Sequence, residues 1–235
     1  MLADDKIERY SRQIILPEVG GKGQERILDS SVLIALDGSV RDSAVLYLAA
    51  AGVGRIGLVG AQADSVVSCF AGNIDPNRQF ACLNPDCRVE VYASVSGKQS
   101  GRLVDQHDFI IGSNEILHDA CYAKKKPFFW VVASGQRGEI FFSCGDQPDW
   151  PCLRCVMREQ KEYRCGLDGP SSPFTGLFLG TQAATEVVKV ILGINTTHQP
   201  KLLQWDFSAL NITEHKVKKN TSCPVCSNAC SSHRE

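Results

Sequence analysis

The sequence predicts an α/β protein with a Rossmann-like, mostly parallel sheet and helices on both of its faces. The first observation is that short apolar, β-rich runs alternate with helical patterns through the first two thirds of the 235 residues. The second is a change of texture after residue 133, where β-rich segments and polar loops predominate. Because 43% of the residues are hydrophobic and 22% are charged, the chain can bury a core, and a disordered protein is excluded.

The expected elements follow from the spacing of apolar residues and from the glycines that end helices. Six strands are expected at residues 31–36, 55–59, 88–93, 108–111, 128–133 and 139–144, with helical stretches at 43–51, 98–105 and 115–124. Further along, a loop is expected at 160–173, a long helix at 174–192 and a hairpin of strands at 202–207 and 211–217. In a sheet of this kind, ligands bind at the carboxyl ends of the strands, beside a switch in strand order.

The charge and the cysteine content limit the classes of binding partner and the cellular compartment that we expect. The chain has 25 Lys and Arg residues against 26 Asp and Glu residues, so its charge gives no reason to expect nucleic acid or a membrane as a partner. Residues 1–10 lack the apolar core of a signal peptide, and no apolar run is long enough to span a membrane. Eleven cysteines, an odd number, exclude a complete set of disulfides, so we expect a cytoplasmic protein.

Two Cys-x-x-Cys pairs predict a metal site. Cys152 and Cys155 form the first pair, and Cys223 and Cys226 form the second. Four thiolates in two such pairs make a tetrahedral sulfur site, which suits zinc and leaves no open position for a substrate. The alternative is a redox Cys-x-x-Cys, which usually occurs singly, and Cys230 lies close enough to the second pair to be an alternative ligand. The zinc would staple the carboxyl-terminal part to the rest of the chain.

Cys165 is a candidate nucleophile. It lies in the polar loop expected at 160–173, with Arg164 before it and Gly166 after it. An accessible thiol beside a positive charge is the setting in which a cysteine becomes reactive. The alternative interpretation is an ordinary exposed thiol.

Several segments together resemble the ThiF/MoeB/HesA family, the bacterial relatives of ubiquitin-activating enzymes. The matching segments are 9–14 (RYSRQI), 32–34 (VLI), 47–54 (YLAAAGVG), 83–85 (LNP), 151–155 (PCLRC), 180–193 and 223–226 (CPVC). The resemblance implies a homodimer with a Rossmann-like domain and a double Cys-x-x-Cys zinc site. It also implies an adenylyltransferase activity, in which Mg-ATP activates the carboxyl-terminal Gly-Gly of a small ubiquitin-fold sulfur-carrier protein.

The resemblance divides the chain into regions. Residues 1–30 would form an N-terminal helical arm, 31–133 a Rossmann-like region of the nucleotide-binding type, and 134–226 a zinc-stapled region of the carrier-binding type. Residues 227–235 would be a loose tail.

The nucleotide site implied by the resemblance lacks several of the family's groups. In the glycine-rich turn Leu36 and Arg41 replace the first and third glycines, and only Gly38 remains, beside the negatively charged Asp37. The acidic residue that holds the ribose falls on Gly60. The same losses exclude a nicotinamide dehydrogenase, because a dinucleotide needs these groups as well.

The groups that handle charge are also changed. The second acidic position after the second strand falls on Gln62, and the Asp-Asn pair that holds magnesium in the family appears as Ser113 and Asn114. No lysine occurs between Lys22 and Lys98, where the family has its catalytic lysine. Carboxylate attack on ATP needs positive charge and preorganised donors around the phosphates, so these losses are costly.

Four residues remain as candidates by resemblance. Arg12 would reach an ATP phosphate across the dimer interface, although a surface salt bridge is the alternative. Gly38 and Asn114 are the remaining cofactor-binding candidates for ATP and magnesium, and Cys165 falls where several family members have a reactive cysteine. Arg78, in a second arginine-bearing motif, is not expected to be catalytic.

Two functions follow. The favoured hypothesis is a protein that binds a small ubiquitin-fold carrier, with weak or no adenylylation, as a homodimer or as a heterodimer with a paralogue. The alternative is an active adenylyltransferase in which Cys165 takes part in thiol transfer.

Overall fold

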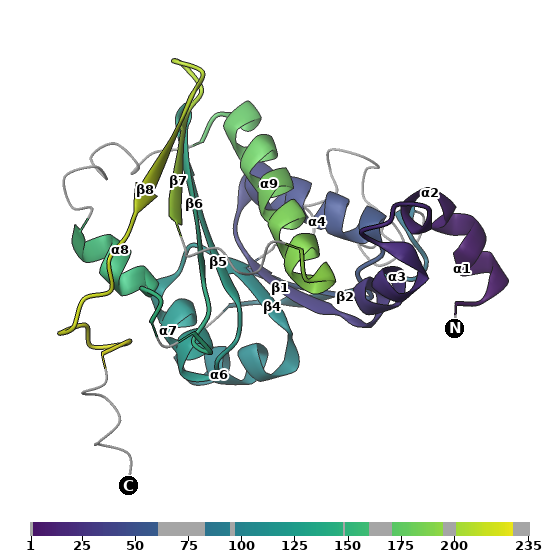
Figure 1. Ribbon diagram of the computed structural model, residues 1–235, viewed down its shortest axis with the longest axis horizontal. Helices are drawn as coiled ribbons and strands as arrows, with labels where there is room; N and C mark the ends of the chain where they lie inside the picture. Colours follow the sequence, from purple (N-terminus) through teal and green to yellow (C-terminus); the bar gives the residue numbers. More distant parts are fainter. Residues whose placement is uncertain are drawn as a thin grey trace, which may run out of the picture.

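The computed structural model describes residues 2–60, 83–94, 97–147, 149–159, 171–194 and 201–227. Its centre is one eight-stranded sheet with the order β3-β2-β1-β4-β5-β6-β7-β8 (Figure 1). The strands are β1 (Ser31–Ala35), β2 (Arg55–Val59), β3 (Arg88–Tyr92), β4 (Phe109–Gly112), β5 (Phe128–Ser134), β6 (Arg137–Ser143), β7 (Lys201–Asp206) and β8 (Asn211–Lys216). From β3 to β5 all neighbours are parallel, whereas β5 to β8 pair antiparallel.

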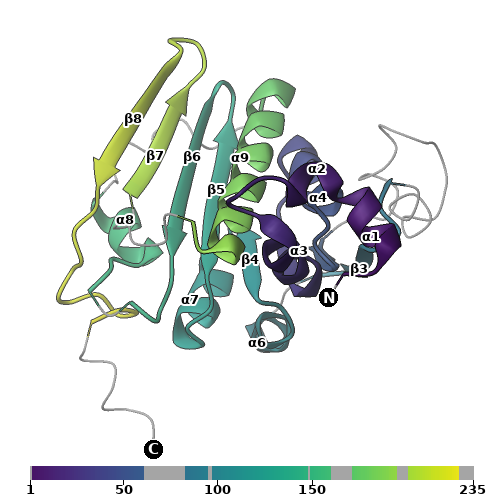
Figure 2. The same cartoon turned by 45° about the vertical axis from the view of Figure 1, so that its right-hand side comes forward.

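Helices cover both faces of the sheet, as the sequence predicts. In chain order they are α1 (Asp4–Arg9), α2 (Ser11–Ile14), α3 (Gly20–Asp29), α4 (Gly38–Ala51), α6 (Gly97–Gln106), α7 (Glu115–Ala123), α8 (Leu153–Glu159) and α9 (Pro173–Leu192). The helices α3, α4 and α9 lie on one face, and α6, α7 and α8 lie on the other (Figures 1 and 2). Among the described residues, no helix is both long and apolar enough to cross a bilayer.

The central strand β1 shows how the two layers form. Val32 and Ile34 belong to the core cluster under α4 and α9, while Leu33 between them belongs to the cluster under α6, α7 and α8. Successive side chains of a strand point to opposite faces, so a continuous apolar run is what a strand covered on both faces requires.

Two features differ from the sequence-based expectation, whereas the other expected elements agree within two residues at each end. Helix α4 begins at Gly38, five residues before the expected start at residue 43, and Gly38 adopts the φ of 59° at this start that a glycine tolerates. Helix α8 was not expected, because its few apolar residues lie among cysteines and charged residues and show no helical period. The expected loop at 160–173 lies mostly outside the described residues.

The division into regions stays a prediction. One continuous sheet crosses the expected boundary at residue 133, because β5 pairs with β6 along its whole length. Of the expected tail at 227–235, only Ser227 is among the described residues.

Helices α4 and α9 touch at their amino ends because α9 has glycines at the crossing. A Cβ atom at Gly176 would clash with Ser39, and one at Gly180 would clash with the carbonyl oxygen of Val40. The Ser43 hydroxyl at the same crossing donates to the backbone oxygens of α4 and lies 3.5 Å from the carbonyl oxygen of Gly176. The contact places the start of α9 beside the start of α4.

Candidate functional site

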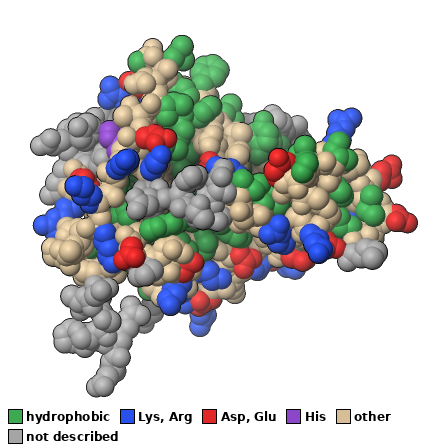
Figure 3. All heavy atoms as spheres, viewed as in Figure 1, with side chains coloured by type: hydrophobic (Ala, Val, Ile, Leu, Met, Phe, Trp, Pro, Cys, Tyr) green, Lys and Arg blue, Asp and Glu red, His purple; other side chains and the backbone are tan. Residues whose placement is uncertain are grey.

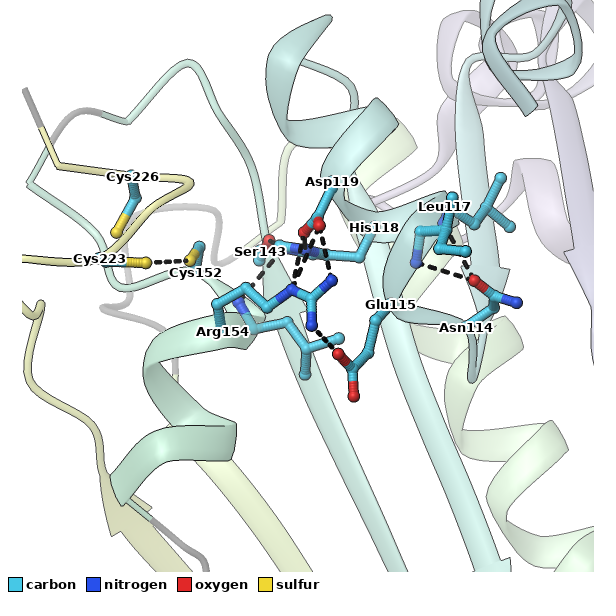
Figure 4. Close-up of polar contacts among 12 residues, drawn as sticks. Asn114, Glu115, Leu117, His118, Asp119, Ser143, Cys152, Arg154, Cys223 and Cys226 are labelled. Carbon is cyan, nitrogen blue, oxygen red and sulfur yellow. Dashed lines mark hydrogen bonds and ion pairs between the residues drawn. The ribbon is translucent and has the colours of Figure 1, made fainter. Parts of the chain in front are cut away.

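The two Cys-x-x-Cys pairs meet in one buried cluster. The Sγ atom of Cys152 lies 3.5 Å from that of Cys223 and 3.9 Å from that of Cys155, and the Sγ atoms of Cys155 and Cys226 are 3.4 Å apart. All four sulfur atoms lie within 4.8 Å of one another, and the four cysteines are free of disulfides. Figure 4 shows Cys152, Cys223 and Cys226 of this cluster. A tetrahedron with Zn–S bonds of about 2.3 Å has edges of about 3.8 Å, so these sulfur atoms fit the ion.

The thiols perturb one another's ionisation. Hydrogen bonds to Cys155 and Cys226, together with burial, raise the pKa of Cys152 above its usual range. Hydrogen bonds from Cys152 and Cys226 lower the pKa of Cys155, which accepts them as the thiolate. Four neighbouring thiolates repel one another, so complete ionisation requires a cation among them.

Local structure presents the thiols toward one another. Cys152 immediately precedes α8, whose first turn carries Cys155, and the amides of Cys155 and Val156 donate to the carbonyl oxygen of Cys152. The second pair lies in the turn after β8, where the amide of Asn220 donates to the sulfur of Cys155 over 3.4 Å. This amide supports a negative charge on the sulfur.

An ion-pair network that sequence reasoning missed lies beside the cluster. Arg154, between the two cysteines of the first pair, reaches Asp119 on α7 with Nη2 at 2.8 Å and Nε at 3.2 Å (Figure 4). Its Nη1 atom also pairs with Glu115, one turn earlier on α7. The spacing of Glu115 and Asp119 puts both carboxylates on one helix face, which is a signal in the sequence, but only the fold places Arg154 opposite them.

His118 forms the buried part of this network. Its Nδ1 atom lies 3.0 Å from Asp119, and its Nε2 atom lies 3.0 Å from the hydroxyl of Ser143 at the end of β6. The amide of Leu153, the first residue of α8, donates to the same Nε2 atom over 3.2 Å. An acceptor at Nε2 puts the proton of the neutral ring on Nδ1, from which it is donated to Asp119.

The strand order changes direction between β1 and β4, and two of the predicted residues lie at this point. Gly38 begins α4 shortly after β1, and Asn114 caps α7 shortly after β4. The two strands are neighbours, with Ala35 opposite Gly112, so both residues lie at the same carboxyl edge. The side-chain oxygen of Asn114 accepts from the amides of Ile116 and Leu117, so it acts as a helix cap.

The other described residues at this edge offer few groups to a nucleotide. Gly60 follows β2 with a φ of 73°, a conformation in which an aspartate would be strained. Asp37 is exposed, and Arg41 is buried with its guanidinium on Asp42 at 3.0 and 3.1 Å. Burial raises the pKa of Asp42, and the hydrogen bonds from Arg41 oppose that rise.

Arg12 lies at the far end of α4 from this edge. The hydroxyl of Tyr10 bonds to Asn84 and Asp86, and Tyr10 packs against Gly52, where a Cβ atom would meet the ring at 2.7 Å. Gln13 also donates to a carbonyl oxygen near the end of α4. Because α4 has 14 residues, it separates Arg12 from Gly38 by roughly 21 Å.

The predicted site residues thus fall into separate groups. The four cysteines come together, and Gly38 and Asn114 share the edge at β1 and β4. Arg12 is remote from both groups, is exposed, and has no ion-pair partner among the described residues. The positions of Gln62, Arg78, Cys165 and Cys230 lie outside the described residues.

Comparison with known proteins connects this arrangement to one family. A family model described as ThiF family matches residues 77–225. The protein HesA of Trichormus variabilis is 28% identical over 259 residues, covering 97% of this chain and 91% of HesA. The adenylyltransferase and sulfurtransferase MOCS3 of Drosophila grimshawi is 30% identical over 251 residues, covering 96% of this chain. This chain spans only 55% of the length of that MOCS3.

Solved structures show the same fold at low sequence identity. A crystal structure of PaaA superposes with a TM-score of 0.75 and 20% identity, covering 92% of this chain and 84% of PaaA. MccB of E. coli, in its complex with ATP, gives a TM-score of 0.70 and 16% identity, covering 93% of this chain and 74% of MccB.

Proposed function

Since this chain belongs to the ThiF family, we propose that it binds a small ubiquitin-fold sulfur-carrier protein and adenylylates it weakly or not at all. The observation that carries the proposal is the contrast at the carboxyl edge of the sheet. The fold keeps the switch point and the glycine at the start of α4, but the edge holds Gly60 and Ser113 in place of carboxylates.

An apolar surface on the antiparallel part suits a protein partner. Phe174, Leu177 and Phe178, in the first turns of α9, are 81%, 47% and 41% exposed. Phe178 packs edge to face on the buried Trp205 of β7 and on the half-buried Phe207 at ring distances of 5.9 and 5.1 Å, so this surface is anchored to the end of β7. Hydrophobic side chains gather over the hairpin and the adjoining part of α9 (Figure 3). A surface of this kind marks an interaction site in a protein that is otherwise well packed.

This apolar surface adjoins the edge of the sheet. Gly176, between Phe174 and Phe178, touches Ser39, and Ser39 follows Gly38. A folded carrier seated on α9 and the hairpin would therefore have its flexible carboxyl-terminal tail within reach of the switch point. The adjacency supports a carrier rather than an unrelated partner.

Zinc at the four cysteines is part of the proposal. The sulfur distances and the chemistry of the donor set suit zinc, which would link α8 to the turn after β8. An odd number of cysteines, eleven, of which four cluster as a candidate metal site, suits a reducing compartment, which supports a cytoplasmic protein. Metal analysis of the purified protein by mass spectrometry should find one zinc per chain.

The position of the N-terminal helical arm supports a dimer. Arg12 is held at the far end of α4, so it cannot act at the edge of its own sheet, and a second subunit is the place where it could contact a phosphate. The partner would be a second copy of this chain or an intact paralogue. In a heterodimer, Arg12 would serve a site in the paralogue while the site of this chain stays silent.

The alternative function is an active adenylyltransferase with Cys165 in thiol transfer. The names of the curated relatives favour it, because MOCS3 is an adenylyltransferase and sulfurtransferase. Detectable formation of a carrier adenylate, measured as exchange of pyrophosphate into ATP, would establish this alternative.

Carrier binding is tested with a ubiquitin-fold protein that ends in Gly-Gly. Calorimetry should give a measurable affinity for the wild-type chain, and Phe174→Ser should weaken it about tenfold, because an exposed aromatic anchor is lost. Ile15→Ser is the matched control, since Ile15 is 76% exposed on the distant arm. Equal affinities for wild type and Phe174→Ser would contradict docking on this surface.

A further inference from the structure

We propose that Arg154 and His118 are positioning residues that lock the first cysteine pair to α7. Metal binding by the four cysteines would then also order the amino end of α7, at the edge where β1 and β4 diverge. The inference rests on the proposed zinc and is independent of the carrier.

Arg154 makes the outer link. Because it lies between Cys152 and Cys155, its backbone moves with both ligands. Its guanidinium spans two carboxylates one turn apart on α7, Glu115 and Asp119, and donates to both oxygens of Asp119. An isolated surface ion pair contributes little, but a guanidinium that engages several oxygens in a fixed geometry is more specific. Such a contact fixes the direction of α7 relative to the cysteine pair.

His118 makes the inner link. It is fully buried, and its Nε2 atom accepts from the amide of Leu153, one of the amides at the start of α8 that has no partner within the helix. Its other nitrogen donates to Asp119, the same carboxylate that Arg154 engages. One carboxylate therefore orients both the imidazole and the guanidinium, and the start of α8 depends on α7 for a hydrogen bond.

Helix α7 carries the effect to the edge of the sheet. Asn114, which caps the helix, lies five residues before Asp119, so about 7.5 Å of rigid helix separates the cap from the network. Leu117 between them is fully buried, which holds α7 against the sheet. A displacement at Asp119 is therefore transmitted to the cap rather than absorbed by a loop.

Linkage makes the effect reciprocal. If metal binding favours the arrangement in which Arg154 and His118 hold α7, then loss of these contacts must weaken metal binding by the same factor. Partners of this outer kind typically change metal affinity by about 10- to 100-fold.

The first measurement is zinc affinity of the full chain by competition with a chromophoric chelator. Arg154→Gln should lower the affinity about tenfold, and Arg154→Lys should fall between, because an ammonium cannot engage two carboxylates as a guanidinium does. Arg137→Gln is the matched control, since Arg137 pairs with Asp206 at 3.4 Å on the hairpin, and it should leave the affinity unchanged within twofold. If Arg154→Gln does not fold, Glu115→Gln replaces it, since that carboxylate is 38% exposed.

The second measurement is hydrogen exchange with and without zinc. Removal of zinc from the wild type should speed exchange of the amides at 116–118 about tenfold, while α3 stays unchanged. In Arg154→Gln the zinc-dependent difference at α7 should shrink. Equal zinc affinities for wild type and Arg154→Gln, or equal exchange at α7 with and without zinc, would overturn the inference. A wild-type chain that binds no zinc would overturn both this inference and the proposed metal, whereas carrier binding would be unaffected.

Discussion

The cysteine cluster and the edge at β1 and β4 both lie against α7, yet they differ in the functional groups that they contain. At the cluster, four thiols converge, an amide supports one of the sulfur atoms, and Arg154 and His118 bind the surroundings to α7. At the edge, Asn114 is engaged in capping its own helix, and Gly60 and Ser113 offer no carboxylate to a metal or a ribose. The groups proposed to hold the fold together come together at one place, while few of the described residues at the other could neutralise a triphosphate. This contrast supports the proposal that the chain binds a carrier.

Loss of one cysteine ligand should have the largest effect. Cys223→Ser should lower the melting temperature by roughly 10 °C, because a structural metal site contributes several kcal/mol to folding. Differential scanning calorimetry of the zinc-loaded protein measures the change. Cys165→Ser is the control and should have little effect, because the four clustered cysteines already make up a tetrahedral ligand set. Equal shifts for the two variants would remove the structural role assigned to the cluster.

The close contact between α4 and α9 tests the second region of the comparison, because it lies beside the edge at β1 and β4. Gly180→Ala should cost about 2 kcal/mol, because its Cβ atom would press on the carbonyl oxygen of Val40 in a closely packed core. Urea unfolding measures the loss. Thr185→Ala, at an exposed position on the same helix, should change the stability by less than about 0.5 kcal/mol. A neutral Gly180→Ala would show that the amino ends of the two helices are not held as closely as described.

The dependence of stability on pH distinguishes the contribution of the cysteine cluster from that of the rest of the core. His107 is fully buried, and burial lowers its pKa, so the native state binds its proton less readily than the unfolded state. Neutral His107 therefore makes its full contribution to the free energy of unfolding above a pH of about 6.5. As the pH decreases below that value, the contribution is lost by up to about 1.4 kcal/mol per pH unit.

Urea unfolding between pH 7 and pH 5 tests this in a chelator, which removes the contribution of metal release. His107→Gln should be less stable at pH 7 but should show a shallower decline toward pH 5. Parallel curves for wild type and His107→Gln would assign the acid sensitivity to other groups.

The smallest expected effect tests what Asn114 does. Asn114→Ala should cost about 1 kcal/mol, since two amides at the start of α7 lose their acceptor. Asn114→Asp keeps an acceptor and should remain within about 0.3 kcal/mol of wild type, as chemical denaturation would show. If Asn114→Ala were as stable as wild type, the side chain would be free for a ligand instead.

Much of the fold could be predicted because β1, β2 and β4 are short apolar runs buried on both faces. The cysteine cluster could be predicted as well, since the paired spacing itself carries the chemistry. Helix α8 could not, because its seven residues are too few to show a period. The contacts of Arg154 and His118 depend on how α7 and α8 pack together, and nothing local in the sequence encodes that packing.

Binding of ATP tests the central claim most directly. Isothermal titration calorimetry of the zinc-loaded chain with ATP, with and without magnesium, should give no detectable heat of binding and no dependence on the metal. Micromolar binding that requires magnesium would contradict the account, because it would show that the edge at Gly38 still neutralises a triphosphate.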